Sequence, residues 1–200
     1  MVQEFIPGAD SSGVNYNSYT WNGRPCVEMT AKKVRLSPPT YGVPRVVVSG
    51  KVDEIIENGR RILAAMNFNG YACTEFKKDP RDGVYKFMEV NGRHNRSGML
   101  ALYCGINFPL IEYNNLVNGE LPGPQDYREG IYWIDEFRDI WHSLLYCRKE
   151  GYGLRDYLRP YLSEHVFAIM SWEDPKPFIK RSSDLVKKAF TRRSGAEDGG

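Results

Sequence analysis

The chain has 200 residues, of which 42% are hydrophobic, and its 27 basic and 25 acidic side chains give a formal net charge of +2. This length fits one ordinary domain or one lobe of a larger one, with enough apolar residues for a core. The balanced charge excludes the large single-sign field that would attract nucleic acid or an anionic membrane surface.

The cysteines are widely spaced, and none forms a Cys-x-x-Cys pair or lies at zinc-ligand spacing from a histidine. We therefore expect reduced, mostly buried thiols at Cys26, Cys73, Cys104 and Cys147. The sequence shows no signal peptide and no apolar run long enough to span a bilayer, so it predicts a soluble, cytoplasmic protein without a membrane partner.

The first elements are predicted to be strands. Residues 1–6 (MVQEFI) are extended in character and end at Pro7 and Gly8. Because domains seldom begin inside a core strand, we hypothesise that the chain is truncated at its start. The dipeptide Asn22-Gly23 separates two β-prone runs and predicts a hairpin, since a type I′ turn needs positive φ at both central residues.

A loop, a helix and a second hairpin follow. Residues 37–45 contain three prolines and a glycine and predict a loop before a short apolar run at 46–48. Residues 52–66 predict an amphipathic helix packed on a sheet, with a stripe of Val52, Ile55, Ile56, Ile62, Leu63 and Met66. Residues 70–78 and 84–93 predict a hairpin joined by the turn formers at 79–83.

The second half of the chain is predicted to be helical. Short helices are expected at 97–103 and 109–117, ending at Gly105 and at Asn118-Gly119. Two more are expected at 135–149 and 154–162. The aromatic residues of 127–137 (YREGIYWIDEF) are interpreted as core residues at helical spacing, with a pocket lining as the alternative. Residues 191–200 lack apolar anchors and predict a frayed tail.

These elements predict an α+β fold in which helices pack on one face of an antiparallel sheet. We expect this unit to span residues 1–125, a helical extension to span 126–190, and a disordered tail to span 191–200.

One constellation in the second hairpin carries chemistry. Glu89 and Asn91 are two residues apart on a strand and share a face, and a hairpin centred near Asp82 places Glu75 opposite Glu89. Facing carboxylates repel, so a positive group should lie between them. Magnesium suits this position because it prefers oxygen ligands. Spacing alone instead favours a solvated surface hairpin with charges on its wet face.

The residue pattern of this segment favours the metal site over the solvated hairpin. Residues 87–97 (FMEVNGRHNRS) resemble the E-x-N-x-R signature of ATP-grasp enzymes. The resemblance implies that Glu89 and Asn91 bind the metal and that Arg93 is a catalytic residue facing the phosphates or the activated substrate. It also implies that Glu75, in TEFKKD, supplies the other metal ligand from the neighbouring strand.

Other segments resemble the same family in the same order, over residues 2–122. AKKVRLSPPTYG resembles the strand that brings a basic side chain to the nucleotide phosphates, for which Arg35 is preferred over Lys33. Asp10 falls near the position that bonds the ribose. VQEFIPG resembles the hinge strand that meets the adenine, which implies base-binding roles for Gln3, Glu4, Phe5 and Ile6.

Within the family, the combination of K-x-R-x-x-P-P and N-x-R-H-x-x-S looks most like carboxylate-amine ligases related to D-aspartate ligase and to the ATP lobes of carbamoyl phosphate synthase. The resemblance implies part of a ligase that binds ATP with Mg²⁺ or Mn²⁺, activates a small-molecule carboxylate as an acyl-phosphate and joins it to an amine.

The lobe that precedes the hinge in this family has no counterpart in the sequence, so the chain alone is expected to be inactive. A partner chain or an upstream lobe would complete it, and homo-oligomerisation stays open. The alternative is a truncated, non-catalytic nucleotide-binding or protein-interaction module.

Three residues after the signature have competing interpretations. His94 is favoured as a hydrogen-bonded structural histidine over an acid-base catalyst. Arg96 and Ser97 could cap the following helix or contact substrate, and capping by Ser97 is favoured.

The glycines form no Walker or Rossmann spacing, so no phosphate-binding glycine loop is predicted.

Overall fold

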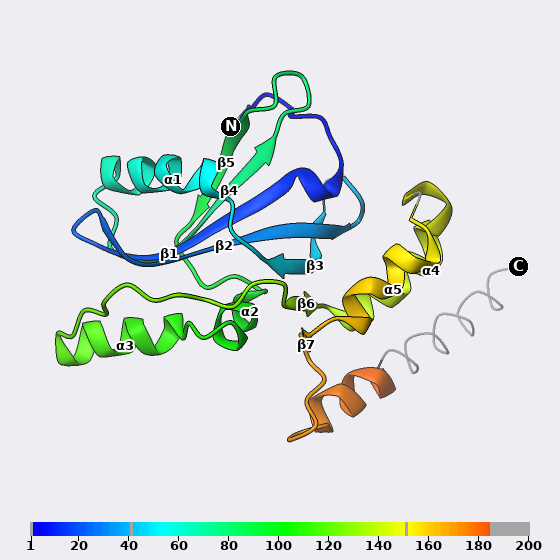
Figure 1. The fold of residues 1–200 in the computed structure, drawn as a ribbon. Coiled ribbons are helices and arrows are strands. Elements are labelled where there is room, and N and C mark those ends of the chain that lie inside the picture. The colour runs from blue at the N-terminus through cyan, green and yellow to red at the C-terminus, as the bar shows by residue number, and fades with distance from the viewer. Residues whose placement is uncertain (1, 41, 151, 185–200) are drawn as a thin grey trace, which may run out of the picture.

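The computed structural model describes residues 2–40, 42–150 and 152–184, with the side chains of 145–150 left undescribed. The described strands form one sheet of seven, in the order β5-β4-β1-β2-β3-β6-β7 (Figure 1). Every neighbouring pair is antiparallel except β6 and β7, which are parallel. The predicted α+β class with an antiparallel sheet is confirmed.

Both predicted hairpins are present. β1 (Gly13–Trp21) pairs with β2 (Arg24–Ser37), and the turn residues Asn22 and Gly23 have φ values of 51° and 69°, as a type I′ turn requires. β3 (Val43–Ser49) continues the sheet beside β2. β4 (Gly70–Lys78) pairs with both β1 and β5 (Tyr85–Asn91).

Helices cover both faces of the sheet, where the sequence had predicted one (Figure 1). α1 (Asp53–Ala65) buries Ile55 and Leu63 against Tyr16. α2 (Gly98–Tyr103) and α3 (Phe108–Asn118) pack on the opposite face, in a core that contains Tyr71 and Trp133. The difference arises because β1 and β4 bury side chains on both faces, so each face needs its own cover.

The last part of the described chain adds strands as well as helices. β6 (Tyr132–Ile134) and β7 (His165–Phe167) extend the sheet beyond β3, with α4 (Glu136–Glu150) and α5 (Leu154–Leu162) between them. The helical spacing assigned to the aromatic run is therefore wrong at 132–134, although all three side chains are buried as predicted. The domain boundary at residue 125 stays a prediction, and the predicted tail lies outside the described residues.

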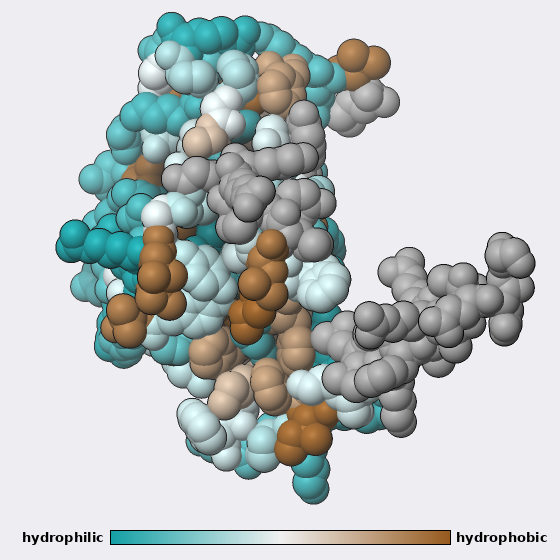
Figure 2. Space-filling view, turned by 90° about the vertical axis from the view of Figure 1, so that its right-hand side faces the viewer, coloured by the Kyte–Doolittle hydropathy of each residue, from teal (hydrophilic) through white to brown (hydrophobic). Residues whose placement is uncertain are grey.

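The helix predicted at 135–149 is confirmed as α4, and several of its apolar side chains face outward. Ile140, Trp141 and Leu144 are exposed, whereas Asp139 and Ser143 are buried. Figure 2 views the molecule from this side and shows separate apolar side chains standing out among polar ones. None of the helices described here is long and apolar enough to cross a membrane.

The opening segment is not a strand. Residues 2–9 have no regular structure and lead into a short 3₁₀ helix, η1 (Asp10–Ser12). Side chains tie the segment to the sheet instead: Gln3 Nε2 donates to the Met88 carbonyl at 3.0 Å, and Lys77 Nζ donates to the Ile6 carbonyl at 2.8 Å. Met88 has no partner on β4 because the register shifts there, so β5 offers an irregular edge for pairing.

Candidate functional site

A cavity of about 570 Å³ lies where the opening segment meets the strands of the two hairpins and the loop after β2. This volume suits a small-molecule ligand. The cavity brings together residues that are far apart in the sequence. Of the predicted site residues, only Arg35 does not line it. The others in its walls are Gln3, Glu4, Phe5, Ile6, Asp10, Lys33, Glu75, Glu89, Asn91 and Arg93.

The three predicted oxygen donors converge. Glu75 on β4 is in register with Glu89 on β5, as the hairpin turn predicted. The Asn91 amide Nδ2 lies 2.8 Å from Glu89 Oε1 and 3.4 Å from Glu75 Oε1. A half-turn of this amide would present its oxygen to the same point, since oxygen and nitrogen occupy equivalent positions.

A positive group does lie beside the paired carboxylates. The Lys33 ammonium forms an ion pair with Glu75 Oε2, and the two side chains are only 13% and 20% exposed. No group of three or more histidine, cysteine or acidic side chains in the described parts of the chain could hold a metal. A metal here would therefore depend on the Asn91 oxygen together with two carboxylates, a donor set that fits Mg²⁺ or Mn²⁺.

Two buried polar atoms in the cavity wall were missed by the sequence reasoning. Asn15 on β1 is in register with Glu75 and is 2% exposed, yet its Oδ1 accepts no hydrogen bond from the described residues. The buried Trp133 Nε1 likewise has no acceptor among them. A buried polar group without a hydrogen bond costs about 1–3 kcal/mol, so a ligand that bonds to either atom would be stabilised there. The sequence signal for Asn15 was its place on β1: paired with Glu75, its side chain lies on the same face of the sheet.

The residues after β5 divide between the cavity and the core. Arg93 is exposed and lines the cavity without an ion pair or hydrogen bond to any described residue. His94 stacks on Tyr71 with ring centroids 4.4 Å apart, and its Nε2 lies 2.8 Å from Glu112 Oε2. This environment matches the predicted structural histidine.

Arg96 and Ser97 also line the cavity. Arg96 Nη2 lies 2.5 Å from Asp135 Oδ2, a carboxylate that is fully buried just before α4. Ser97 occupies the cap position of α2, but its side chain makes no capping hydrogen bond. The predicted capping role of Ser97 is therefore wrong: its hydroxyl points instead toward Asn95 Oδ1, 3.5 Å away.

The predicted reduced thiols are confirmed for the cysteines whose side chains are described. Cys26, Cys73 and Cys104 are all free, while the side chain of Cys147 is not described. Burial raises the pKa of the Cys73 thiol to about 12, so it stays protonated at neutral pH. Asn95 Nδ2 lies 3.3 Å from its sulfur and 3.0 Å from Asn17 Oδ1. These residues form a satisfied polar layer beneath the site.

Comparison with known proteins gives a sequence relative and solved structures of similar fold. No protein-family model matches the sequence. D-aspartate ligase of Enterococcus faecium (strain Aus0004) is 32% identical over 110 residues, which cover 54% of this chain and 26% of that protein. A biotin carboxylase from Campylobacter jejuni, solved as a β-γ-ATP complex, has a TM-score of 0.50 and 13% identity over 65% of this chain and 30% of its own.

A second solved structure agrees. Rhizobium etli pyruvate carboxylase T882A with acetyl coenzyme-A has a TM-score of 0.50 and 17% identity, covering 60% of this chain and 13% of its own. This chain therefore shares the fold of a part of each of these two carboxylases. It spans about a quarter of the length of the curated ligase that it matches.

The ATP-grasp resemblance favoured Arg35 as the basic residue of β2, and the structure reverses that preference. Val34 has no partner on β3, because Lys33 pairs with Val47 while Arg35 pairs with the adjacent Val46. This bulge turns Arg35 to the opposite face, away from the cavity. There Arg35 is 1% exposed, and its Nη2 lies 2.9 Å from Asp139 Oδ2. Of these two basic residues of β2, only Lys33 lines the cavity.

Asp10 lines the cavity, but both of its oxygens are engaged. Oδ2 accepts the Leu36 amide at 2.9 Å, and Oδ1 accepts the Thr40 amide at 2.8 Å. Asp10 thus holds the end of β2 and the following loop in place. Its contact with a ribose stays a prediction.

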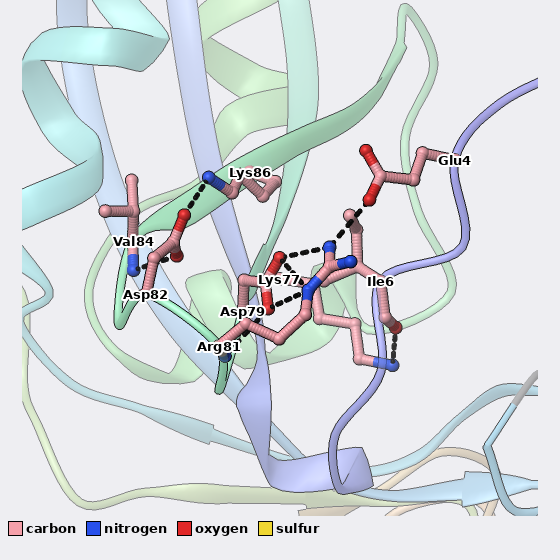
Figure 3. Close-up of polar contacts among 8 residues, drawn as sticks. All are labelled: Glu4, Ile6, Lys77, Asp79, Arg81, Asp82, Val84 and Lys86. Carbon is pink, nitrogen blue, oxygen red and sulfur yellow. Dashed lines mark hydrogen bonds and ion pairs between the residues drawn. The ribbon is translucent and has the colours of Figure 1, made fainter.

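The opening segment forms one wall of the cavity and is anchored at the hairpin turn (Figure 3). Arg81 Nη2 lies 2.7 Å from Glu4 Oε1 and 2.6 Å from Asp79 Oδ2. The Arg81 guanidinium lowers the pKa of Asp79 to about 2. The Phe5 ring lies 5.5 Å from Lys77 Nζ and is 58% exposed. An exposed aromatic ring at the cavity wall is suited to contact a flat base.

Proposed function

We propose that this chain is the C-terminal half of an ATP-grasp domain that binds ATP with Mg²⁺ and serves a carboxylate-amine ligase. The observation that carries the proposal is the convergence of Glu75, Glu89 and Asn91 in one cavity beside Lys33 and Arg93. Kinship with D-aspartate ligase supports the ligase class.

In this proposal one part of the cavity binds the base of ATP and another part binds its phosphates. The exposed Phe5 ring and the backbone of residues 3–6 border the base, and Lys33 meets the phosphate chain. Glu75, Glu89 and Asn91 would hold the magnesium ion, which when bound neutralises the charge of the phosphates. The exposed Phe5 and the oxygen cluster line the same cavity, as an extended nucleotide requires.

The reaction proposed is acyl activation followed by amide formation. A carboxylate oxygen of the acid attacks the γ-phosphorus, and ADP leaves. The amine nitrogen then attacks the acyl carbon, phosphate leaves, and the nitrogen loses a proton. Arg93 carries no ion pair among the described residues, so its planar guanidinium is available to hold two oxygens of the transferred phosphoryl group. Positioned charges of this kind supply most of the catalysis in phosphoryl transfer.

A nucleotide-binding or protein-interaction module without turnover is the second candidate. The outward-facing Ile140, Trp141 and Leu144 of α4 favour a protein contact. Release of ADP by the 200-residue chain in the presence of ATP, Mg²⁺ and a pool of amino acids would contradict this candidate.

The metal assignment is tested by isothermal titration calorimetry of ATP with and without Mg²⁺. We expect Glu89→Ala to weaken magnesium-dependent binding about tenfold or more, a change of about 1.4 kcal/mol per factor of ten. Glu54→Ala is the matched control, because Glu54 is an exposed carboxylate on α1, outside the cavity. If Glu89→Ala and Glu54→Ala bind alike, the metal assignment is rejected.

A further inference from the structure

The path of the Lys33 side chain to Glu75 is unusual. Lys33 belongs to β2 and Glu75 to β4, and β1 lies between these two strands. Lys33 therefore reaches its partner by crossing a whole strand. It crosses at Gly13, where an added Cβ would stand 2.9 Å from Lys33 Cδ and 3.5 Å from Lys33 Cγ. The missing side chain of Gly13 makes room for the crossing.

The backbone gives no other reason for a glycine there. Gly13 has φ −81° and ψ 135°, an extended conformation that any residue adopts. Gly13 is the first residue of β1, and a glycine in a strand often marks a close approach by another group. In this structure the approaching group is the aliphatic arm of Lys33.

Lys33 and a metal would need the same carboxylate. The ammonium engages Glu75 Oε2, while Asn91 reaches toward Glu75 Oε1 and Glu89 Oε1. Both a lysine ammonium and a divalent cation are compact positive charges that seek carboxylate oxygens. Two positive charges on one carboxylate repel each other, so the binding of the metal weakens the pairing of Lys33 with Glu75, and the reverse.

Asn15 gives a second, independent sign that the site is incomplete. Asn15 lies next to Glu75 across the β1–β4 ladder, is 2% exposed, and has an Oδ1 that accepts no hydrogen bond from the described residues. Its oxygen is one that a cation or a cation's water ligand would satisfy. The pair of Lys33 and Glu75 therefore leaves part of the local oxygen set unused.

We infer that Lys33 is a built-in counter-ion that holds Glu75 until a metal-nucleotide complex enters and then exchanges Glu75 for the phosphates. Gly13 is the positioning residue that opens its path across β1. This inference rests on the proposed function. A nucleotide gives the displaced ammonium a new partner, so the divalent cation and the nucleotide bind cooperatively. Without a nucleotide, the cation must displace Lys33 with no compensation and binds weakly.

The test measures Mn²⁺ binding to the 200-residue chain by the electron paramagnetic resonance signal of free Mn²⁺, with and without ADP. We expect Lys33→Met to tighten Mn²⁺ binding without ADP about tenfold, and to reduce the gain that ADP brings. Gly13→Ala should shift nucleotide-free Mn²⁺ binding in the same direction by a smaller factor, because the displaced Lys33 retains its charge. Lys86→Met, which removes a lysine of the same hairpin outside the cavity, should change neither value.

Unchanged or weaker nucleotide-free Mn²⁺ binding in Lys33→Met overturns the exchange, as does an equal tightening in Lys86→Met. Circular dichroism checks that each variant is folded, and the comparison of Lys33→Met with Lys86→Met stands without Gly13→Ala. Failure of the proposed function has a different signature. In that case Glu89→Ala leaves Mn²⁺ binding in the presence of ADP unchanged, whatever Lys33→Met does.

Discussion

Lys33 and Arg35 lie two residues apart on β2 and have opposite environments. Lys33 enters the cavity and pairs with a carboxylate that other groups also approach. Arg35 lies on the far side of the sheet, where it and Asp139 are 1% exposed or less. The bulge at Val34 separates them, because it reverses the alternation of side chains along the strand.

The Arg35 side of the sheet is a buried structural network centred on Asp139. Asp139 on α4 accepts from Arg35 Nη2 and Arg45 Nε, each at 2.9 Å, and from the Tyr161 hydroxyl at 2.6 Å. The Tyr157 ring lies 4.9 Å from Arg35 Cζ. These contacts tie β2 and β3 to α4 and α5. The comparison teaches that a fully desolvated ion pair with a saturated carboxylate builds the fold. The partly exposed pair of Lys33 and Glu75 lines a cavity instead, where it is free to exchange partners.

The strongest way to break this comparison is to remove Asp139. Asp139→Ala leaves two buried guanidinium groups close together without their carboxylate, and we expect it to lower the free energy of unfolding by about 3–5 kcal/mol. Urea denaturation followed by circular dichroism measures the change. Asp126→Ala, in an exposed loop, is the control and should lie within about 0.5 kcal/mol of the unaltered chain. A loss below about 1 kcal/mol for Asp139→Ala would show that the network is not structural.

A direct comparison of Arg35→Met with Lys33→Met sharpens the contrast. Arg35→Met should lower the free energy of unfolding by about 2 kcal/mol, because it removes a buried charge-assisted hydrogen bond while Arg45 still pairs with Asp139. It should leave nucleotide affinity unchanged. Lys33→Met should destabilise by about 1 kcal/mol or less and weaken ATP binding.

Denaturation and calorimetry on the same two variants separate stability from binding. If Arg35→Met weakened ATP binding in proportion to its loss of stability and Lys33→Met did not, the roles assigned to the two residues would be reversed.

The parts of the site that the sequence predicted depend on local rules. The hairpin turn at 79–83 fixes the register that faces Glu75 with Glu89, and strand alternation then places Asn91 on the same face. The Asn22-Gly23 turn likewise determines the pairing of β1 with β2. Such features follow from a few neighbouring residues, so reading the sequence was enough.

The parts that it missed depend on contacts between distant residues. Nothing in the sequence near Val34 marks a bulge, so the preference for Arg35 over Lys33 could not be tested from the sequence. The three-residue strands β6 and β7 are too short for a periodic pattern, and they form because β3 presents an edge to them. Residues 2–6 look like a strand but meet β5 through side chains instead.

The smallest expected effect concerns the anchor of the cavity wall in Figure 3. Arg81→Gln removes the guanidinium that joins Glu4 to Asp79, so the opening segment should detach more often from the hairpin. We expect several-fold faster amide hydrogen exchange across residues 3–8, with the exchange of β1 unchanged. Lys86→Met, which breaks the neighbouring pair with Asp82, is the matched control and should not affect that segment.

The same variant has a signature in acid. Because Arg81 lowers the pKa of Asp79 from its ordinary 3.8 to about 2, the pair stabilises the fold above pH 3.8 and that contribution is lost as the pH falls toward 2. In Arg81→Gln this contribution is absent at every pH. The stability difference between the unaltered chain and the variant should therefore shrink between pH 4 and pH 2. A difference that stays constant over this range would mean that Arg81 supports the wall by packing and not through Asp79.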